Sequence, residues 1–186
     1  MSAIAAVTVY AASSRQSPQA FCDLAHALGR GLAERGLVTV YGGARVGVMG
    51  ALAEAALAAG GRVEGVILDE FSGVAHEGLH ALETVGDMRS RKAGLADRGD
   101  AFVVLPGALG TLEEVAEVLV ERQLGFHAKP VILVNYEGFW DPLLALFDRQ
   151  LRDGILQPAH HAIPVVVADA HKALAALDAE AARRSA

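Results

Sequence analysis

The sequence predicts an α/β fold in which helices cover both faces of one mostly parallel β-sheet. Short apolar runs rich in valine and isoleucine alternate with longer segments whose apolar residues recur at helical spacing. Strands without a polar face are typical of parallel sheets, because both faces of such a sheet are buried. The chain has 186 residues, and no break in composition divides it. We therefore expect residues 1–186 to form a single doubly wound domain of the Rossmann-like type.

Apolar runs and glycines define the expected elements. Strands are expected at residues 4–11, 37–42, 62–68, 82–86, 101–107, 130–136 and 162–168, of which 82–86 is the weakest. Helices are expected at residues 17–36, 47–61, 87–99, 111–125, 141–154 and 169–186. Three helices end in a glycine that suits a left-handed C-terminal cap, namely Gly36, Gly60 and Gly99. The last few residues are expected to fray.

Composition excludes several classes of protein. Hydrophobic residues make up 53% of the chain, but no apolar run approaches the roughly 20 residues of a membrane span. We expect a soluble protein without a membrane partner, and the first apolar stretch lacks the preceding basic region of a signal peptide. A formal charge of −6 provides no basic surface for nucleic acid.

Cysteine and histidine content gives two further expectations. The single cysteine, Cys22, excludes an internal disulfide and is compatible with a reducing cytoplasm. Its helical segment predicts a buried structural thiol rather than a nucleophile. The seven histidines are dispersed, and the adjacent His160 and His161 lack the spacing of a zinc motif, so we expect no metal site.

Ligands of doubly wound folds bind where the carboxyl ends of strands lead into helices. Three such junctions stand out, at residues 10–18 with Ser13, at residues 41–50 with Gly42 and Gly43, and at residues 105–114. The second junction has four glycines but lacks the G-x-G-x-x-G dinucleotide motif. A loop that approaches a ligand closely and a tight turn against the sheet are both compatible with it.

The third junction, "LPGALGTLEE", has two interpretations of similar weight. Its glycines, Gly107 and Gly110, let the backbone approach a ligand, and the N–H groups at the start of the following helix form an anion site suited to phosphate. Alternatively, Thr111 and Glu114 form a capping box, in which each side chain accepts a hydrogen bond from the backbone at the helix start. This segment alone does not decide between them.

Two helices place charged residues near these junctions. In "DMRSRKAGLADRG", Arg89, Arg91 and Lys92 lie near a helix start, where the dipole disfavours cations. An anionic ligand or partner carboxylates would compensate, although solvated surface charge also explains each of them.

The helix after the third junction has two expected faces. The residues expected to be buried are Leu112, Val115, Ala116 and Leu119. The residues expected on the other face are Glu113, Glu114, Glu117 and Glu121. Helical geometry therefore selects no catalytic carboxylate, although only Glu113 and Glu114 lie in the first turn.

Three ordered motifs, "VYGGARVGVMG", "DMRSRKAG" and "LPGALGTLEE", resemble the LOG family, the cytokinin riboside 5′-monophosphate phosphoribohydrolases, long described as lysine decarboxylases. The resemblance extends over nearly the whole chain. It implies hydrolysis of the N-glycosidic bond of an adenosine 5′-monophosphate whose N6 is free or substituted, without a cofactor. It also implies a homodimer, for which Val118 and Val120 offer apolar flanks, and we expect a cytoplasmic location from the single cysteine.

The resemblance assigns roles to residues that match the family's motifs. The P-G-G-x-G-T-x-x-E and M-H-x-R-K motifs imply that Arg91 and Glu114 form the catalytic pair. The phosphate-binding segment that the resemblance implies is Gly107, Ala108, Leu109, Gly110 and Thr111. The other residues expected to bind substrate are Met88, Lys92, Gly42, Gly43 and Ser13.

The chain departs from the family pattern at several positions. Ala108 replaces a glycine, and its methyl group would disfavour a left-handed backbone. Gly73 stands where a glutamate is common. Arg89 replaces a histidine, and Val120 and Glu121 replace Thr-Trp. We expect the last three positions to influence which base is accepted.

Three other functions compete with hydrolysis. A nucleotide- or cofactor-binding carrier would use the same fold and similar glycine loops. A DNA-binding relative would need a basic face, which the net charge opposes. Lysine decarboxylation would need an electron sink such as pyridoxal phosphate, and no lysine has a recognisable Schiff-base setting.

Overall fold

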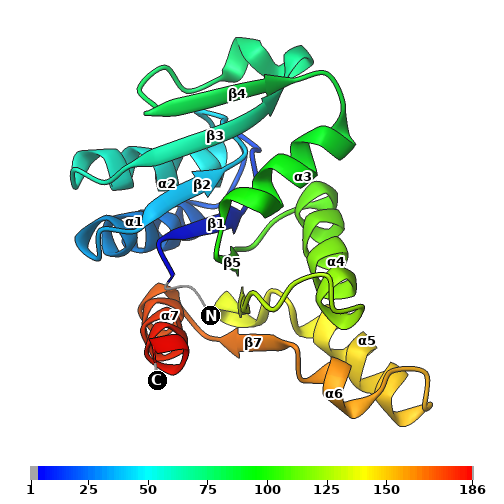
Figure 1. Cartoon of the computed structure of the whole chain (residues 1–186). Helices are drawn as coiled ribbons and strands as arrows, with labels where there is room; N and C mark the ends of the chain where they lie inside the picture. Colours follow the sequence, from blue (N-terminus) through cyan, green and yellow to red (C-terminus); the bar gives the residue numbers. More distant parts are fainter. Residues whose placement is uncertain (1–3, 186) are drawn as a thin grey trace.

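The computed structural model describes residues 4–185. Their seven strands form one sheet in the order β4-β3-β2-β1-β5-β6-β7, with every neighbouring pair parallel (Figure 1). The strands are β1 (Ala6–Tyr10), β2 (Val38–Tyr41), β3 (Val63–Leu68), β4 (Ala81–Val85), β5 (Ala101–Val104), β6 (Val131–Val134) and β7 (Pro164–Val167). All seven expected strands are present, and the doubly wound α/β fold is confirmed. The expected fraying at Ala186 lies outside the described residues.

The strand order reverses at the centre of the sheet. From β1 the chain proceeds outward through β2, β3 and β4, and then returns to add β5, β6 and β7 on the other side of β1. Loops that leave the carboxyl ends of β1 and β5 therefore diverge in opposite directions, and this is where doubly wound folds have room for a ligand.

Helices cover both faces of the sheet. The α-helices are α1 (Gln19–Glu34), α2 (Gly47–Ala58), α3 (Met88–Arg98), α4 (Leu109–Gln123), α5 (Asp141–Arg152), α6 (Pro158–His161) and α7 (Ala170–Ser185). One core lies under α1, α2 and α7, and the second lies under α3, α4 and α5. Three short elements were not predicted from the sequence: the 3₁₀ segments η1 (Asp69–Val74) and η2 (Tyr136–Gly138), and the helix α6.

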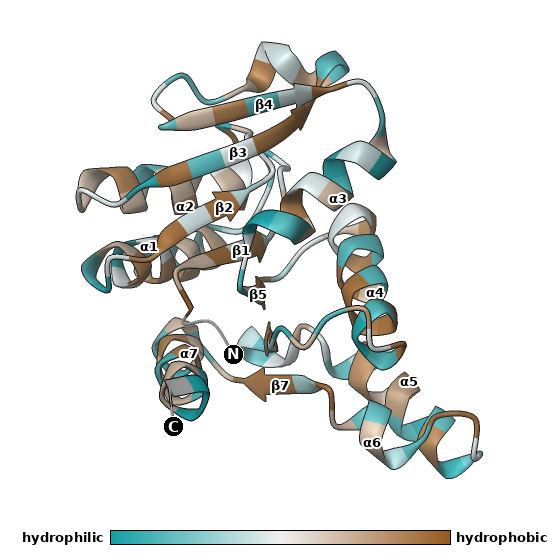
Figure 2. Ribbon diagram, in the orientation of Figure 1, coloured by the Kyte–Doolittle hydropathy of each residue, from teal (hydrophilic) through white to brown (hydrophobic). Residues whose placement is uncertain are grey.

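Alternating side chains of the central strands enter the two cores. In β5, Ala101 and Val103 face one core while Phe102 and Val104 face the other, as the two-residue period of a strand requires. Figure 2 shows hydrophobic residues along β1, β2 and β3 and mixed faces on α4 and α5. Within residues 4–185, none of the helices combines the length and hydrophobicity that a membrane crossing demands.

The expected glycine caps have mixed outcomes. Gly36 and Gly60 adopt positive φ angles of 67° and 77°, which confirms their left-handed conformation. The expectation for Gly99 is wrong, because its φ is −89°. A Cβ at Gly99 would overlap the side chain of Thr8, so this glycine allows the chain to pass close to β1. Cys22 is only partly buried, at the margin of the core.

We predict that Gly29→Ala lowers the free energy of unfolding by about 1–3 kcal/mol, as overpacking does. A Cβ on Gly29 of α1 would overlap the backbone carbonyl of Leu52 in α2, and backbone cannot move aside. Helix propensity alone would favour alanine by about 1 kcal/mol. Urea unfolding measures the change. Gly31→Ala is the matched control, because the nearest atoms to its Cβ belong to the buried Leu174 side chain and not to backbone; a larger loss there than in Gly29→Ala would contradict the explanation.

Candidate active site

A cavity of about 420 Å³ opens at the carboxyl ends of the central strands. Its wall begins with Ala11 and Ser13 after β1, Gly42 after β2 and Ile67 near the end of β3. The start of α4, after β5, completes it. The cavity therefore lies at the point where the strand order reverses, as the fold predicts.

The start of α4 faces this cavity with free backbone donors. Ala108 is the N-cap residue, with φ −92° and ψ −157°. The first hydrogen bond of α4 is donated by the Leu112 N–H to the Ala108 carbonyl oxygen, at 2.9 Å. The preceding N–H groups of a helix have no intrahelical acceptor. A Cβ built on Gly110 would meet no atom of the described chain within 4 Å, and Gly110 borders the cavity. These features make the helix start suitable for an anion.

The capping box expected at Thr111 and Glu114 is wrong. The helix begins at Leu109, two residues earlier than expected, and no side chain of residues 4–185 caps its start. Thr111 lies buried inside the first turn, and the Glu114 carboxylate turns toward α3 instead of its own backbone. The anion-site interpretation of this junction is compatible with the geometry.

The expected faces of α4 are also partly wrong. Val115 is buried as expected, but Leu112 is 36% exposed, Ala116 is exposed and Leu119 is half-buried. The buried residues of α4 are Thr111, Glu114, Val115 and Val118. The buried face is thus shifted by one residue from the expected one, and it includes Glu114, whose carboxylate contacts Arg91.

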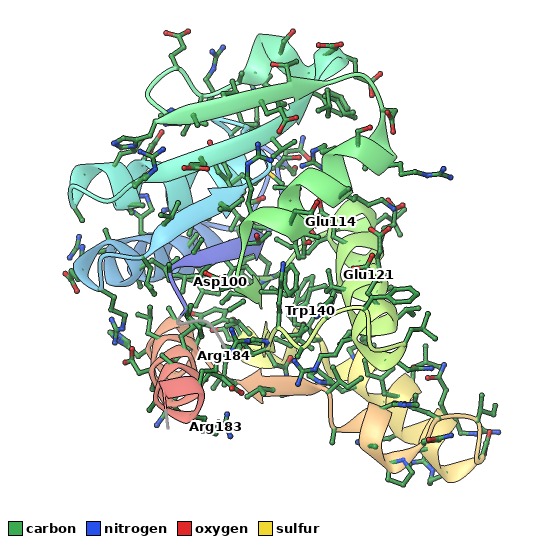
Figure 3. All side chains as sticks on the ribbon, in the orientation of Figure 1. Asp100, Glu114, Glu121, Trp140, Arg183 and Arg184 are labelled. Carbon is green, nitrogen blue, oxygen red and sulfur yellow. The ribbon has the colours of Figure 1, made fainter. Side chains whose placement is uncertain are left out.

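That ion pair joins Arg91 of α3 to Glu114 of α4. Arg91 Nη1 donates to Glu114 Oε1 at 3.0 Å, and Arg91 Nε donates to the Val66 carbonyl at 3.2 Å. The side chains of Glu114 and Arg91 are 3% and 11% exposed, and both border the cavity. Figure 3 labels Glu114 near the start of α4, beside α3. A planar guanidinium held at two points presents its remaining N–H groups in a fixed direction.

Burial raises the pKa of the Glu114 carboxyl to about 7, although the charge and hydrogen bond of Arg91 favour the ionised form. The neighbouring Glu113 raises this pKa further, and Lys92 lowers it. Burial also raises the pKa of Tyr10, with the negative charge of Glu114 as the next cause. Glu114 therefore exchanges a proton near neutral pH, which is typical of carboxyl groups at functional sites.

Gly42 and Gly107 are needed for packing, because neighbouring side chains occupy the space where a Cβ would lie. A Cβ on Gly42 would overlap the Arg91 guanidinium and press on Met49. A Cβ on Gly107 would overlap the side chain of Thr111. Gly42 thus makes room for Arg91, and Gly107 makes room for the buried Thr111.

The structure brings most of the candidate substrate-binding residues to the cavity. Those that border it are Ser13, Gly42, Met88, Ala108, Gly110 and Thr111. Four others do not border it among the described residues, namely Gly43, Lys92, Gly107 and Leu109. Gly43 has a positive φ of 77° and packs under Leu82 and Ile67, and Leu109 is 82% exposed.

Several cavity residues were missed by sequence reasoning. Arg15 lies in the first junction, and its charge near two glycine loops could have marked it as an anion partner. Phe71 and Val74 belong to η1, a segment without a sequence signal for function. A backbone bridge between Ala44 and Ala75 joins η1 to the loop after β2. Within residues 4–185, no group of three or more His, Cys, Asp or Glu residues is arranged for a metal ion.

The structure shows where the departures from the family pattern lie. Ala108 has an extended backbone, so its methyl group causes no left-handed strain. Gly73 accepts a hydrogen bond at its carbonyl from Arg45, at 3.2 Å. Arg89 is exposed on α3. Val120 borders a separate groove, and neither it nor Glu121 borders the cavity in the described chain.

Comparisons with known proteins agree with this geometry. A family model described as possible lysine decarboxylase matches residues 49–177. The cytokinin riboside 5′-monophosphate phosphoribohydrolase of Rhodococcoides fascians is 43% identical over 174 residues, which cover 92% of this chain and 88% of that protein. A probable enzyme of the same name from Oryza sativa subsp. japonica is 45% identical, and the match covers 88% of this chain and 73% of the rice protein. The chain belongs to the family of cytokinin riboside 5′-monophosphate phosphoribohydrolases.

A solved structure supports the fold alone. The molybdenum cofactor carrier protein of Chlamydomonas reinhardtii superposes with a TM-score of 0.74 and 22% identity, covering 93% of this chain and 95% of the carrier. At this identity the similarity shows that both chains share the doubly wound architecture.

We predict that Gly42→Ala displaces Arg91 and lowers the free energy of unfolding by about 1–3 kcal/mol, because its Cβ would overlap the guanidinium. The Arg91 Nε–H resonance should shift in an NMR spectrum of the arginine side chains, and chemical unfolding should report the stability. Gly73→Ala is the control, since a Cβ there meets no described atom within 4 Å. An unchanged Arg91 resonance in Gly42→Ala would contradict the packing role.

Proposed function

We propose that this protein hydrolyses the N-glycosidic bond of a cytokinin riboside 5′-monophosphate, an N6-substituted adenosine 5′-monophosphate, and releases the free base and ribose 5-phosphate. The observation that carries the proposal is the buried Arg91–Glu114 pair, which borders a cavity beside a helix start with free backbone donors. Relatives at 43% and 45% identity are named for this reaction.

In this proposal the 5′-phosphate binds at the start of α4. The backbone N–H groups from Leu109 to Thr111 supply donors, so an exposed leucine side chain is compatible with a backbone role. Gly107 and Ala108 shape the turn that presents them. Arg15 and Ser13 border the same cavity from the loop after β1 and add a positive charge and a hydroxyl group.

The base is proposed to occupy the apolar part of the cavity. Met49, Met88, Phe71 and Val74 border this part. Methionine and phenylalanine provide polarisable surface for a purine ring and an apolar N6 substituent. Gly42 and Gly43 keep the loop after β2 close to its neighbours, with Gly42 against Arg91 and Met49 and Gly43 against Ile67.

The chemical step requires a group that stabilises the positive charge that develops on the ribose. The oxygen of a water molecule adds to C1′, the bond from C1′ to the base nitrogen breaks with its electron pair on the base, and the base takes up a proton. By analogy with glycoside hydrolysis, ionised Glu114 stabilises the oxocarbenium character at C1′ or accepts the proton of the attacking water. Arg91 orients the Glu114 carboxylate through a directional guanidinium.

Binding energy from the phosphate holds the ribose in register with Glu114. Interactions with a remote, non-reacting group lower the activation barrier when they fix the reacting centre. Nucleosides, which lack the phosphate, are therefore poor substrates. The reaction needs water and no cofactor, and the single free thiol of Cys22 is compatible with our proposal of a cytoplasmic location.

Lysine decarboxylation fits the cavity poorly. Pyridoxal phosphate forms a Schiff base with a lysine, but no lysine borders the cavity in residues 4–185. Lys92 binds Glu113 and Glu117, and Lys129 Nζ donates to the Ala96 carbonyl at 2.6 Å. Both lysines are therefore already used as structural donors.

We predict that Glu114→Gln lowers kcat for the monophosphate by about 100-fold or more, the range of a positioned acid–base group. The amide keeps the shape of the side chain but can neither stabilise a cation by charge nor accept a proton. Chromatography should measure the base released from AMP, N6-isopentenyladenosine 5′-monophosphate and N6-isopentenyladenosine.

The matched control is Glu34→Gln, which removes an exposed carboxylate on α1 and should leave turnover unchanged. Release from the monophosphates only, with loss in Glu114→Gln, supports the proposal and identifies the preferred base. Tight nucleotide binding by the wild-type protein without any release would contradict hydrolysis and favour a carrier.

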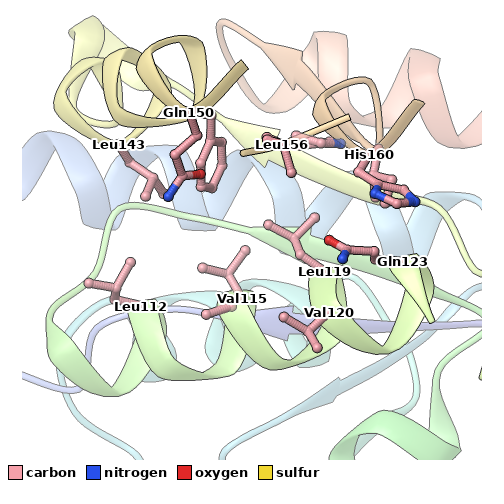
Figure 4. A pocket seen from close by; sticks show the side chains of 13 residues that line it. Leu112, Val115, Leu119, Val120, Gln123, Leu143, Gln150, Leu156 and His160 are labelled. Carbon is pink, nitrogen blue, oxygen red and sulfur yellow. The ribbon is translucent and has the colours of Figure 1, made fainter. Parts of the chain in front are cut away.

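We further propose that the protein is a homodimer that associates through an apolar groove of about 180 Å³ between α4 and the α5–α6 region. The groove is bordered by Leu119 and Val120 of α4 and by Phe147 and Leu156 of the α5–α6 region. Figure 4 shows Leu119 on the α4 side and Leu143 and Leu156 on the opposite side. Val120 is 51% exposed in the single chain. The family resemblance implies a dimer, and a contiguous apolar surface is where a partner gains most from burial.

We predict that Val120→Glu converts the dimer to a monomer, because it places a charge in the apolar groove. Sedimentation velocity should show the change in mass. Ala58→Glu, at the exposed end of α2, should leave the assembly intact. A protein that is monomeric before any substitution, or a Val120→Glu variant that remains dimeric, would contradict this interface.

A further inference from the structure

Lys92 lies next to Arg91 on α3 but contacts different carboxylates. Its Nζ is 2.8 Å from Glu113 Oε1 and 3.3 Å from Glu117 Oε2, both on α4. Only 16% of the Lys92 side chain is exposed, although both of its partners are more open to solvent. The hydrogen bonds to Glu113 and Glu117 raise the pKa of Lys92, which keeps the ammonium charged.

We propose that Lys92 is a positioning residue for the Arg91–Glu114 pair: it holds Glu113 and Glu117 and thereby fixes α4 against α3 in the register at which Arg91 meets Glu114. This inference rests on the proposed function of that pair. It differs from the role that the family resemblance implies, in which Lys92 contacts substrate.

The first argument is geometric. Among the described residues, the hydrogen bonds and ion pairs between α3 and α4 are those of Arg91 and Lys92. Successive side chains of a helix point about 100° apart, and these two neighbours bind the successive carboxylates Glu114 and Glu113. Val115 and Val118 already hold α4 in the second core. The contacts of Lys92 add a second polar connection beside the Arg91–Glu114 pair, which restrains the rotation and the axial position of α4 relative to α3.

The second argument is electrostatic. The charged or titratable groups that face Glu114 are Arg91 and Lys92 from α3, Tyr10 from β1, and Glu113 from its own helix, with Arg15 also bordering the cavity. The negative charge of Glu113 raises the pKa of Glu114, and the positive charge of Lys92 lowers it. Lys92 therefore offsets an adjacent carboxylate that would otherwise favour the protonated, inactive form of Glu114.

The third argument concerns the substrate. Lys92 does not border the cavity in residues 4–185, whereas Arg91 does. An ammonium group has three donors, and two are directed at Glu113 and Glu117. Contact with a phosphate in the cavity would require Lys92 to leave both carboxylates.

The test compares Lys92→Met, Lys92→Arg and Glu113→Gln with the wild type. Carboxyl-labelled glutamate and a Glu114→Gln reference assign the Glu114 carbon resonance, whose titration follows the pKa without any need for activity. In parallel, kcat and KM for N6-isopentenyladenosine 5′-monophosphate are measured against pH. Thermal unfolding confirms that each variant is folded.

We expect opposite shifts from opposite charges. Lys92→Met should raise the pKa of Glu114 by about half a unit to one unit, and Glu113→Gln should lower it by a similar amount. Because ionised Glu114 is the active form, the rising limb of kcat against pH should move in the same directions. We expect Lys92→Met to lower kcat about 10-fold with less than about a threefold change in KM, because positioning acts on the transition state. Lys92→Arg should restore most of kcat.

Three outcomes would overturn the inference. A rise in KM of about 10-fold or more for the monophosphate, with kcat retained, would show that Lys92 binds phosphate. Shifts of the Glu114 pKa in the same direction in Lys92→Met and Glu113→Gln would indicate only a general loss of structure. An unchanged Glu114 pKa in both Lys92→Met and Glu113→Gln would show that Lys92 and Glu113 do not influence the ionisation of Glu114. If the wild type releases no base but the opposite shifts appear, the proposed reaction fails while the positioning of Glu114 by Lys92 remains supported.

Discussion

The buried pair of Arg91 and Glu114 is the interaction on which the organisation of this site depends. Removing a carboxylate from water is costly, and a partner with good geometry must offset that cost. Arg91 provides it, and the Val66 carbonyl keeps the guanidinium in place. The Arg91 guanidinium lies where a Cβ on residue 42 would overlap it, which requires a glycine in the loop after β2. The buried face of α4 includes the charged Glu114. A charge pair thus overrides simple amphipathic packing at this point.

Glycines around the cavity fall into two physical groups. Gly42 and Gly107 accommodate neighbouring side chains, Arg91 and Thr111, which would overlap a Cβ. Gly110 has open space where its side chain would be and borders the cavity. The first group organises the protein around the site, and the second leaves room beside a helix start. The single motif "PGALGT" includes both kinds, which is why its glycines cannot be interpreted as a uniform ligand loop.

Sequence reasoning predicted the fold well, because strands buried on both faces have an unambiguous composition. All seven strands appear, including the weak edge strand β4. It failed where tertiary contacts override local preference. Hydrophobic spacing placed Glu114 on the polar face of α4, since spacing contains no information about a cation arriving from α3. Family resemblance selected Arg91 and Glu114 correctly as neighbours, but it also grouped Lys92 with the cavity residues. Phe71 was missed because η1 has neither periodicity nor a motif.

One helix lies between the cavity and the apolar groove. The cavity is bordered by residues between positions 11 and 114, whereas the apolar groove is bordered by residues between 112 and 164. Within residues 4–185, α4 is the only helix or strand that borders both, with Glu114 at the cavity and Leu119 at the groove. Among the described residues, the segments after α4 border the groove but not the cavity. Substitutions in α4 itself are constrained twice, because a rigid helix cannot adjust one side without moving the other.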